Sequence, residues 1–297
     1  MNRLFCIVGT NASGKSSLGI QMALEYGASI ISADSRQVYK GLDLGSGKVT
    51  REEMMGVKHY LIDVADPNDF FSLSHYQALA YDAIDSVCAG NEKAFLVGGT
   101  GLYVNAVVDG YDLSDAAPDL ELRKKIEKMT HEELIAIITG NAPGLMEGLD
   151  LKNKRRLERA AEKALSPDHG KRANRKRYRT CLAGVTWPRD ELYERIRIRL
   201  DDRLEKGMID EVVALRQQGA TDDFLYRLGL EYRYILMYLR GEFDSYESFY
   251  DKLFMEIRHL AKEQMTWFRK RSDITWIDMK KDPVRACRDL IDRFYDE

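Results

Sequence analysis

Short apolar runs alternate with helical patterns in the first third of the chain. Runs rich in strand-favouring residues cover positions 3–8, 28–32, 59–64 and 94–98. Between them, hydrophobic residues recur at helical spacing, and a further helix is expected after Gly101. This alternation predicts a parallel sheet with helices on both faces, and ligands at the carboxyl ends of its strands.

The rest of the chain is mostly helical in pattern, with two further strands. The elements expected there are polar helices over 119–165, a strand over 179–186, long helices over 188–218 and 246–271, a strand over 274–277 and a last helix. We therefore predict an α/β fold, a P-loop NTPase-like parallel sheet flanked by helices, with a helical insertion subdomain. Residues 1–114 and 178–297 are assigned to the core of this fold, and residues 115–177 to a basic helical insertion.

One loop has the pattern G-x-x-x-x-G-K-S and lies between the first strand and the first helix. In such a loop backbone N–H groups point at a phosphate, Lys15 adds a positive charge, and Ser16 offers a hydroxyl to Mg²⁺. The residues expected to bind a diphosphate or triphosphate are Gly9, Thr10, Asn11, Ala12, Ser13, Gly14, Lys15 and Ser16.

Polar residues also follow other predicted strands. Asp34 comes directly after the second strand, where a carboxylate could hold Mg²⁺ or act as a general base. Its alternative role is to cap the following turn together with Ser35. Thr100 follows a glycine pair that permits close approach of the backbone to a ligand. Asp63, at the end of the third strand, is a weaker candidate for a metal-binding carboxylate.

The net charge of −3 conceals a strongly basic segment. Residues 152–179 contain twelve Lys or Arg against three Asp or Glu, so this segment carries +9 and the remainder −12. Within it, residues 171–179 hold six basic residues in nine. Such a segment is either a solvated surface or a site for a phosphate backbone, and composition alone leaves both open.

Composition excludes several classes of protein. A hydrophobic content of 44% with 31% charged residues is ordinary for a globular protein. No apolar run reaches the roughly 18–20 residues of a membrane span, and no signal-peptide pattern is present. The four cysteines are far apart, which argues against a zinc site or a disulfide framework. We expect a cytoplasmic protein without a membrane partner.

Six segments, in order over nearly the whole chain, resemble the tRNA dimethylallyltransferase family, also called isopentenyl-tRNA transferases. They are 32–48 (SADSRQVYKGLDLGSGK), 59–67 (HYLIDVADP), 97–110 (VGGTGLYVNAVVDG), 153–162 (NKRRLERAAE), 191–212 (ELYERIRIRLDDRLEKGMIDEV) and 264–270 (QMTWFRK). The resemblance implies transfer of a dimethylallyl group from its diphosphate to N6 of the adenosine 3′-adjacent to the anticodon in tRNA. It also implies Mg²⁺ as cofactor, the anticodon stem-loop as partner, and pyrophosphate instead of ATP in the loop. We expect a monomer. The zinc finger of eukaryotic members is absent from the sequence, which indicates the bacterial form. The core, 1–114 and 178–297, would then be catalytic, and the basic insertion, 115–177, would bind tRNA.

The resemblance also implies roles for single residues. Lys15, Arg199 and Mg²⁺ on Ser16 would stabilise the departing diphosphate, which a weak nucleophile such as an adenine amine requires. Asp34 matches the residue that accepts the N6 proton, and Thr100 is the fourth catalytic candidate. The positions expected near tRNA are Asp34, Ser35, Arg36, Gln37, Thr100, Arg123, Arg156, Leu157, Glu158, Arg159 and Ala160.

A base in an anticodon loop must be flipped out to reach a recessed carboxylate, and we expect the basic segment to hold its flanking backbone. Trp267 and Phe268 are expected to pack in the core. Departures from the family pattern are Thr10-Asn11 for Pro-Thr, Ser16 for Thr, Arg203 for Met, Gly229–Tyr232 for Gly-Tyr-Lys-Glu, and Glu263 for Arg.

Three alternatives stay open from the residues themselves. A P-loop small-molecule kinase would use the same phosphate loop, with Asp34 activating a hydroxyl, but a lid motif with paired arginines is not evident. A prenyltransferase acting on free AMP or ADP would need no basic insertion. A non-enzymatic RNA-binding module would leave the phosphate loop and Asp34 without a role.

Overall fold

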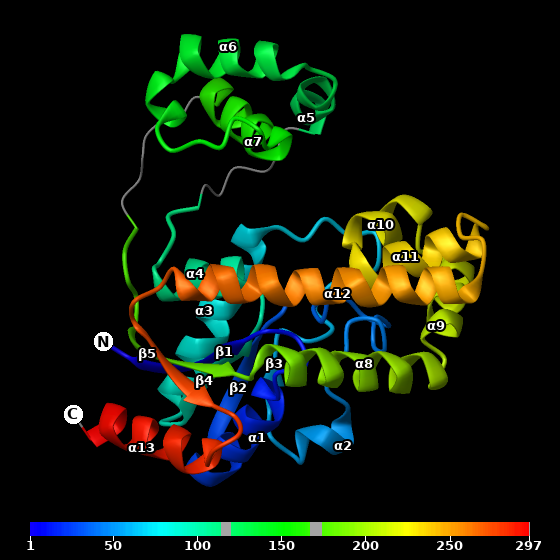
Figure 1. Cartoon of the computed structure of the whole chain (residues 1–297). Helices are drawn as coiled ribbons and strands as arrows, with labels where there is room; N and C mark the ends of the chain where they lie inside the picture. Colours follow the sequence, from blue (N-terminus) through cyan, green and yellow to red (C-terminus); the bar gives the residue numbers. More distant parts are fainter. Residues whose placement is uncertain (114–119, 167–173, 297) are drawn as a thin grey trace. The chain divides into compact units, whose positions relative to one another are not determined.

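The computed structural model describes residues 1–113, 120–166 and 174–296. Its larger unit, Met1–Tyr111 with Arg175–Glu297, is built around a parallel sheet with the strand order β3-β2-β4-β1-β5-β6 (Figure 1). The strands are β1 (Arg3–Gly9), β2 (Ala28–Ala33), β3 (His59–Tyr60), β4 (Lys93–Gly98), β5 (Arg179–Thr186) and β6 (Ile274–Asp278). This confirms the predicted α/β architecture.

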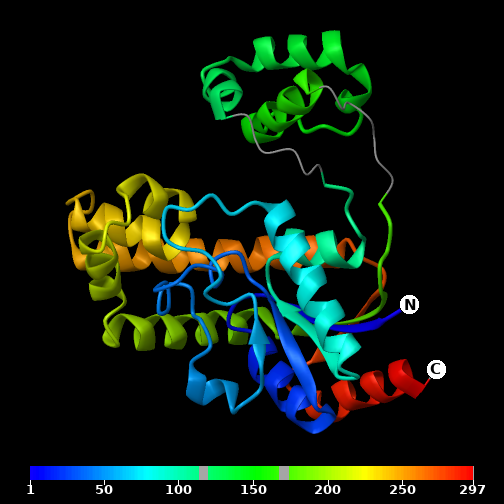
Figure 2. The ribbon, with the colours of Figure 1, turned by 180° about the vertical axis from the view of Figure 1, so that it is seen from behind.

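Helices cover both faces of this sheet, which is why its central strands are continuous apolar runs. The helices of the larger unit are α1 (Lys15–Tyr26), α2 (Arg51–Met54), α3 (Leu73–Ala89), α4 (Gly101–Val108), α8 (Arg189–Glu205), α9 (Met208–Gln217), α10 (Asp222–Leu228), α11 (Leu230–Leu239), α12 (Tyr246–Arg269) and α13 (Pro283–Asp296). Phe5 and Ile7 of β1 pack with α1 and α13 on one face. Leu4 and Cys6 face the other way, toward the core that α3, α4 and α12 share. Figure 2 shows the backbone of the sheet and its helices from behind.

Two predicted elements differ from the structure for local reasons. The helix expected over 188–218 is broken into α8 and α9 at Gly207, whose φ of +93° is incompatible with a continuing helix. The strand expected over 59–64 ends at Tyr60, because Leu61 and Asp63 have positive φ angles. The helices α2, α10 and α11 were not predicted. Helix α2 has only four residues, and a single residue, Gly229, separates α10 from α11.

The second unit, Asp112–Asn174, is a small helical subdomain. Its helices are α5 (Leu120–Glu127), α6 (His131–Asn141), the 3₁₀ turn η1 (Pro143–Met146) and α7 (Lys154–Leu165). They enclose a hydrophobic core of their own, formed by Ile126, Leu134, Ile138, Leu157, Ala160 and Ala161. The expected limits of this insertion were 115 and 177.

The end of the basic segment belongs to the larger unit. The Arg175 N–H donates to the Gly110 carbonyl at 2.8 Å, and the Tyr178 hydroxyl donates to Asp85 at 2.9 Å. Arg177 also pairs with Asp85. Lys171 and Arg172 lie outside the described residues. Within the described part of the chain, no helix is both long and apolar enough to cross a membrane.

Candidate active site

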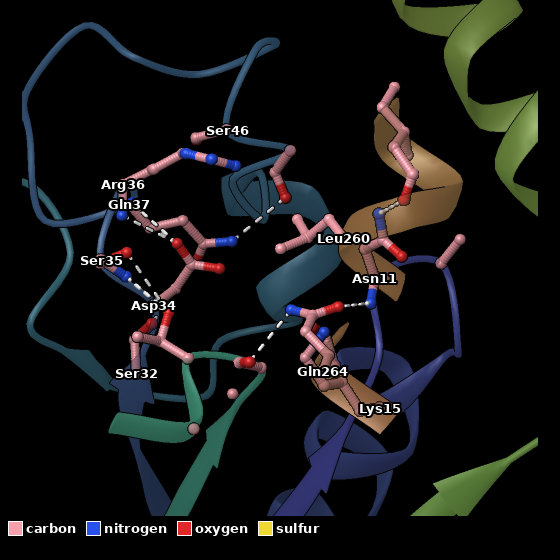
Figure 3. Close-up of a pocket in the computed structure, with 18 of the residues that line it drawn as sticks. Asn11, Lys15, Ser32, Asp34, Ser35, Arg36, Gln37, Ser46, Leu260 and Gln264 are labelled. Carbon is pink, nitrogen blue, oxygen red and sulfur yellow. Dashed lines mark hydrogen bonds between the residues drawn. The ribbon is translucent and has the colours of Figure 1, made fainter. Parts of the chain in front are cut away.

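A cavity of about 310 Å³ lies at the carboxyl ends of β1, β2 and β4 (Figure 3). Three segments that follow these strands line it, and α8, α11 and α12 complete its wall. Its lining includes Asn11, Ala12, Lys15, Ser16, Asp34, Ser35, Arg36, Gln37, Gly99, Thr100, Arg199, Arg203, Glu231 and Gln264. The structure therefore brings the predicted phosphate loop and the predicted carboxylate into one site.

Neighbouring side chains hold the phosphate loop in shape. Gly14 adopts the left-handed conformation, with φ of +83°, directly before α1. The Ser13 hydroxyl donates to the Thr10 carbonyl at 2.8 Å, inside the loop. From outside, the Trp187 indole donates to the Ser13 carbonyl and the Arg195 guanidinium to the Ala12 carbonyl, each at 2.9 Å. The Ala12 and Ser13 carbonyls are thus occupied by side chains that do not line the cavity.

Two cations face the cavity from different elements. The Lys15 ammonium, at the start of α1, donates to the Thr10 carbonyl at 3.1 Å. The Arg199 guanidinium, on α8, donates to the Gly47 carbonyl at 2.9 Å. Burial lowers the pKa of Lys15 to about 8, and burial together with the neighbouring Arg203 lowers the pKa of Arg199. The charge of Lys15 is therefore costly in the cavity, and an anionic ligand would offset that cost.

Asp34 lies across the cavity in a turn with many hydrogen bonds. Its Oδ1 accepts from the backbone N–H of Arg36 at 2.9 Å and of Gln37 at 3.3 Å. The Thr100 hydroxyl oxygen accepts from the Ser35 N–H at 3.1 Å. Asp34 therefore caps its turn, as the alternative reading proposed, and also lines the cavity. Its Oδ2 has no hydrogen-bond partner in the described residues and remains available to a ligand.

Side chains of the same turn reach further elements. The Gln37 carboxamide donates to the Gly47 carbonyl at 3.2 Å, and accepts from the Ser32 hydroxyl at 3.4 Å. The Arg36 guanidinium donates to the Leu228 carbonyl, at the end of α10, at 3.2 Å. The Gly47 carbonyl thus accepts hydrogen bonds from both Gln37 and Arg199.

Two of the departures from the family pattern pair with each other. The Arg203 guanidinium on α8 donates to the Glu231 carboxylate on α11 at 3.0 Å, and both residues are buried. A second nitrogen of Arg203 donates to the Leu44 carbonyl at 2.9 Å. Arg36 lies 3.6 Å from the other Glu231 oxygen. Arg203 is therefore held by two acceptors, the Glu231 carboxylate and the Leu44 carbonyl.

The cavity also has an apolar wall. Trp267 lies against Gly101, where any Cβ would come within 2.2 Å of its indole. Trp267 both lines the cavity and packs on the core, whereas Phe268 is fully buried, as expected. The apolar lining side chains are Val97, Leu102, Ile196, Ile257, Leu260 and Trp267. This wall can accept a small hydrocarbon group between the cations and Asp34.

The donor set of the cavity fits a magnesium ion bound together with a diphosphate. Ser16 lines the cavity beside Lys15, at the position from which a P-loop hydroxyl meets the ion. Within the described residues, no group of three or more His, Cys, Asp or Glu side chains could hold a metal. Mg²⁺ typically takes few protein ligands and keeps phosphate oxygens and water, so a hydroxyl such as that of Ser16 can take part in its coordination.

The predicted tRNA positions of the insertion differ in exposure. Arg156 and Arg159 on α7 are exposed, and Arg159 pairs with Glu162 at 2.6 Å. Arg123 also pairs with Glu162, at 2.9 Å. Glu158 is half-buried and lies 3.8 Å from Lys154. Leu157 and Ala160 are buried in the core of the insertion, so their side chains support α7 and do not face a partner.

Several residues of the cavity were not identified from the sequence as site residues, among them Gln264, Arg203 and Glu231. Gln264 on α12, and the pair Arg203 and Glu231, lie on helices far along the chain from the phosphate loop. Gln264 begins a motif that carried the resemblance, which was the available signal. Asp63, by contrast, pairs with Lys48 and is not among the described residues that line the cavity.

Comparison with known proteins agrees with this geometry. The family model described as IPP transferase matches residues 37–271. The tRNA dimethylallyltransferase of Acetivibrio thermocellus is 38% identical over 289 residues, which cover 94% of this chain and 92% of that protein. The tRNA dimethylallyltransferase 2 of Citrifermentans bemidjiense is 38% identical over 293 residues, covering 97% and 94%.

Solved structures show the same relationship. The tRNA isopentenylpyrophosphate transferase of Bacillus halodurans is 33% identical, with a TM-score of 0.76 over all of this chain and 98% of that one. A eukaryotic dimethylallyltransferase, described as acting on tRNA, shares the fold with a TM-score of 0.82 at 19% identity, over all of this chain and 80% of that one. From its sequence, its fold and its cavity, this chain belongs to the IPP transferase family.

Proposed function

We propose that this protein transfers a dimethylallyl group from dimethylallyl diphosphate to N6 of the adenosine 3′-adjacent to the anticodon in tRNA, releasing pyrophosphate. One observation carries the proposal. A single cavity places a phosphate loop with the cations Lys15 and Arg199 opposite the carboxylate of Asp34, with an apolar wall beside them. The names of the similar proteins support the same reaction.

The donor half of the cavity suits a departing diphosphate. As the bond between the allylic carbon and the diphosphate oxygen breaks, negative charge grows on that oxygen. Lys15, Arg199 and the amides of the phosphate loop are already in place to stabilise it, which is the electrostatic form of catalysis. Mg²⁺ held by Ser16 and the diphosphate would supply further positive charge there.

The acceptor half suits a flipped adenine. The N6 lone pair forms the new bond to the allylic carbon, and the proton of N6 passes to the Asp34 carboxylate. Oδ1 of Asp34 is fixed by the Arg36 and Gln37 amides, so the carboxylate presents Oδ2 in a set orientation. Thr100 holds the same turn through the Ser35 amide. The catalytic residues we propose are therefore Lys15, Arg199 and Asp34, with Thr100 supporting Asp34.

The two enzymatic alternatives predict other products from the same cavity. A kinase would consume ATP, and a prenyltransferase for free nucleotides would modify AMP as readily as RNA. Neither explains the exposed basic residues Arg155 and Arg156 on α7. RNA recognition requires such residues, because its affinity depends on contacts with phosphates.

The test is an assay of the purified protein with an anticodon stem-loop, dimethylallyl diphosphate and Mg²⁺, followed by mass spectrometry of the nucleosides. We expect N6-dimethylallyladenosine in the stem-loop, with no ATP consumed and little product from AMP. Asp34→Asn should lower turnover by about 10²–10⁴-fold while the stem-loop binds within a few-fold of wild type. The exposed Asp66→Asn is the matched control. Coupled ATP turnover, or equal modification of AMP, would replace the proposal with the corresponding alternative.

A further inference from the structure

The Gln264 side chain connects two loops of the cavity. It extends from α12, and its Oε1 accepts from the backbone N–H of Asn11 in the phosphate loop at 2.8 Å. Its Nε2 donates to the carbonyl of Gly99 at 3.0 Å (Figure 3). Asn11 follows β1 and Gly99 follows β4, and these strands are hydrogen-bonded neighbours in the sheet. One carboxamide therefore spans the gap between two adjacent strand ends.

A carboxamide satisfies both loops together at every pH. The Asn11 N–H needs an acceptor and the Gly99 carbonyl needs a donor, and a glutamine side chain presents one of each. The fit is tight. A Cβ at Gly99 would lie 2.8 Å from the Gln264 nitrogen, 3.0 Å from the Gly9 carbonyl oxygen and 3.3 Å from the Lys15 ammonium. The glycine at position 99 is what allows Gln264 to approach this closely.

The loops of Asn11 and Gly99 each lead to one half of the site. On the donor side, Asn11 is bonded to α12 a second time, because its side-chain Nδ2 donates to the Ile257 carbonyl at 3.3 Å. On the acceptor side, Gly99 precedes Thr100, whose hydroxyl oxygen accepts from the Ser35 N–H next to Asp34. A path of hydrogen bonds, completed by the peptide link between Gly99 and Thr100, thus runs from the phosphate loop through Gln264 to the turn of Asp34.

We propose that Gln264 is a positioning residue that sets the separation between the donor diphosphate and the acceptor carboxylate. The inference rests on the proposed function, since it concerns the geometry of that transfer. The allylic carbon is held through the phosphate loop, and N6 through the Asp34 turn. The distance between the allylic carbon and N6 therefore depends on how these two loops are joined. A misplacement of about 1 Å can cost about 10²-fold in rate.

The experiment compares three variants in single-turnover transfer to an anticodon stem-loop. Gln264→Leu removes both hydrogen bonds and should lower the transfer rate by about 10²-fold, with the affinities for inorganic pyrophosphate and for the stem-loop changed only a few-fold. Thr266→Val is the matched control on the same helix, where the hydroxyl donates to the Lys262 carbonyl within α12. Its rate should equal that of wild type.

Gln264→Glu adds a second measurement, the pH dependence of the transfer rate, which a purely structural role of Gln264 would not change. An ionised glutamate accepts from Asn11 but cannot donate to Gly99, whereas a protonated one can do both. We therefore expect the rate of this variant, relative to wild type at the same pH, to recover as the pH is lowered. Since the change is nearly isosteric, this variant keeps the test informative if Gln264→Leu does not fold.

Two results would overturn the inference. One is a transfer rate that does not change in either Gln264 variant. The other is a rate loss that weaker binding of pyrophosphate or of the stem-loop accounts for completely. Wild-type protein distinguishes this inference from the proposed function: if wild type forms no product, the function itself is wrong, and if wild type is active while both variants match it, only the role of Gln264 is wrong.

Discussion

Lys15 carries a charge that the cavity does not favour by itself. Burial opposes its ammonium form more strongly than the nearby Asp34 supports it, so its pKa falls from the ordinary range of lysine to about 8. Arg199 is shifted in the same direction, by burial first and then by Arg203. A bound diphosphate would raise the pKa of both groups again, because its negative charge stabilises their charged forms. Binding of the donor should therefore be linked to the protonation of Lys15.

This linkage predicts a pH dependence with a definite sign. Below pH 8 the free protein already carries the Lys15 proton, so pyrophosphate binding should not depend on Lys15 ionisation. Above about pH 8 the free protein loses that proton and the complex retains it, so affinity should fall by up to about tenfold per pH unit. Isothermal titration of pyrophosphate between pH 7 and 9.5 measures this. Lys15→Met is the control, because the ionisation of pyrophosphate itself affects both proteins. A ratio of the two affinities that does not vary with pH would contradict the prediction.

Some site residues could be read from the sequence, and others could not. Lys15 and Asp34 each follow a predicted strand, and parallel strand ends meet at one edge, so their proximity follows from local patterns. Gln264 lies in the middle of α12, where helical spacing gives no indication of which loop it contacts. Glu231 stood out only as a departure from a family pattern. Its partner on α8 depends on tertiary packing, which a single sequence does not reveal.

Among the elements, the central strands β1, β2 and β4 were predicted best, because each is a buried apolar run. The helices α10 and α11 were missed, since Gly229 separates them without an intervening loop. That glycine has φ of +76° and ψ of −175°, a backbone conformation that other residues rarely adopt. The sharp joint directs the first turn of α11, and with it Glu231, toward Arg203 on α8.

The pair Arg203–Glu231 predicts strong coupling between α8 and α11. Removing one partner leaves a buried charge uncompensated, so Glu231→Leu or Arg203→Met alone should lower the free energy of unfolding by about 3–5 kcal/mol. The double variant should lose much less than the sum of the two. Denaturant unfolding of all four proteins measures this coupling.

An exposed pair nearby provides the comparison. Arg227 and Asp223 on α10 also form an ion pair, at 3.0 Å, but their side chains are 65% and 71% exposed, against 11% and 6% for Arg203 and Glu231. The same cycle on this pair should give a coupling of about 0.5 kcal/mol or less. Equal coupling energies for the two pairs would show that burial of Arg203 and Glu231 has no special effect.

At the scale of the whole molecule, the chain forms two separately packed units. All residues of the cavity belong to the larger unit, Met1–Tyr111 with Arg175–Glu297. The insertion has a core of its own, and α7 turns its apolar side into that core. Its exposed side carries Arg155, Arg156, Arg159 and Lys163. The basic segment was visible in the sequence as a charge excess, but only the structure separates its exposed arginines from its buried leucine and alanines.

This division predicts that charge changes on α7 affect RNA and leave the donor alone. Arg155 and Arg156 are exposed and make no ion pair with any described residue. If they contact phosphates of tRNA, Arg155→Gln with Arg156→Gln should weaken binding of the anticodon stem-loop. The dependence of log Kd on log salt concentration should also flatten, by about 0.7–0.9 for each lost contact. The affinity for pyrophosphate should stay unchanged, because the phosphate loop lies in the other unit.

A second double variant separates a local contact from a general effect of net charge. Arg285 and Arg293 are exposed on α13, which packs with α1 on the sheet face away from the core that α12 joins. Arg285→Gln with Arg293→Gln removes the same charge from the protein, so long-range attraction for RNA should fall similarly in both double variants. Only the α7 variant should lose counterion-releasing contacts and show the flatter salt dependence. If both variants bind the stem-loop with equal affinity and equal salt dependence, α7 is a solvated surface, and the phosphates of tRNA are held by other residues.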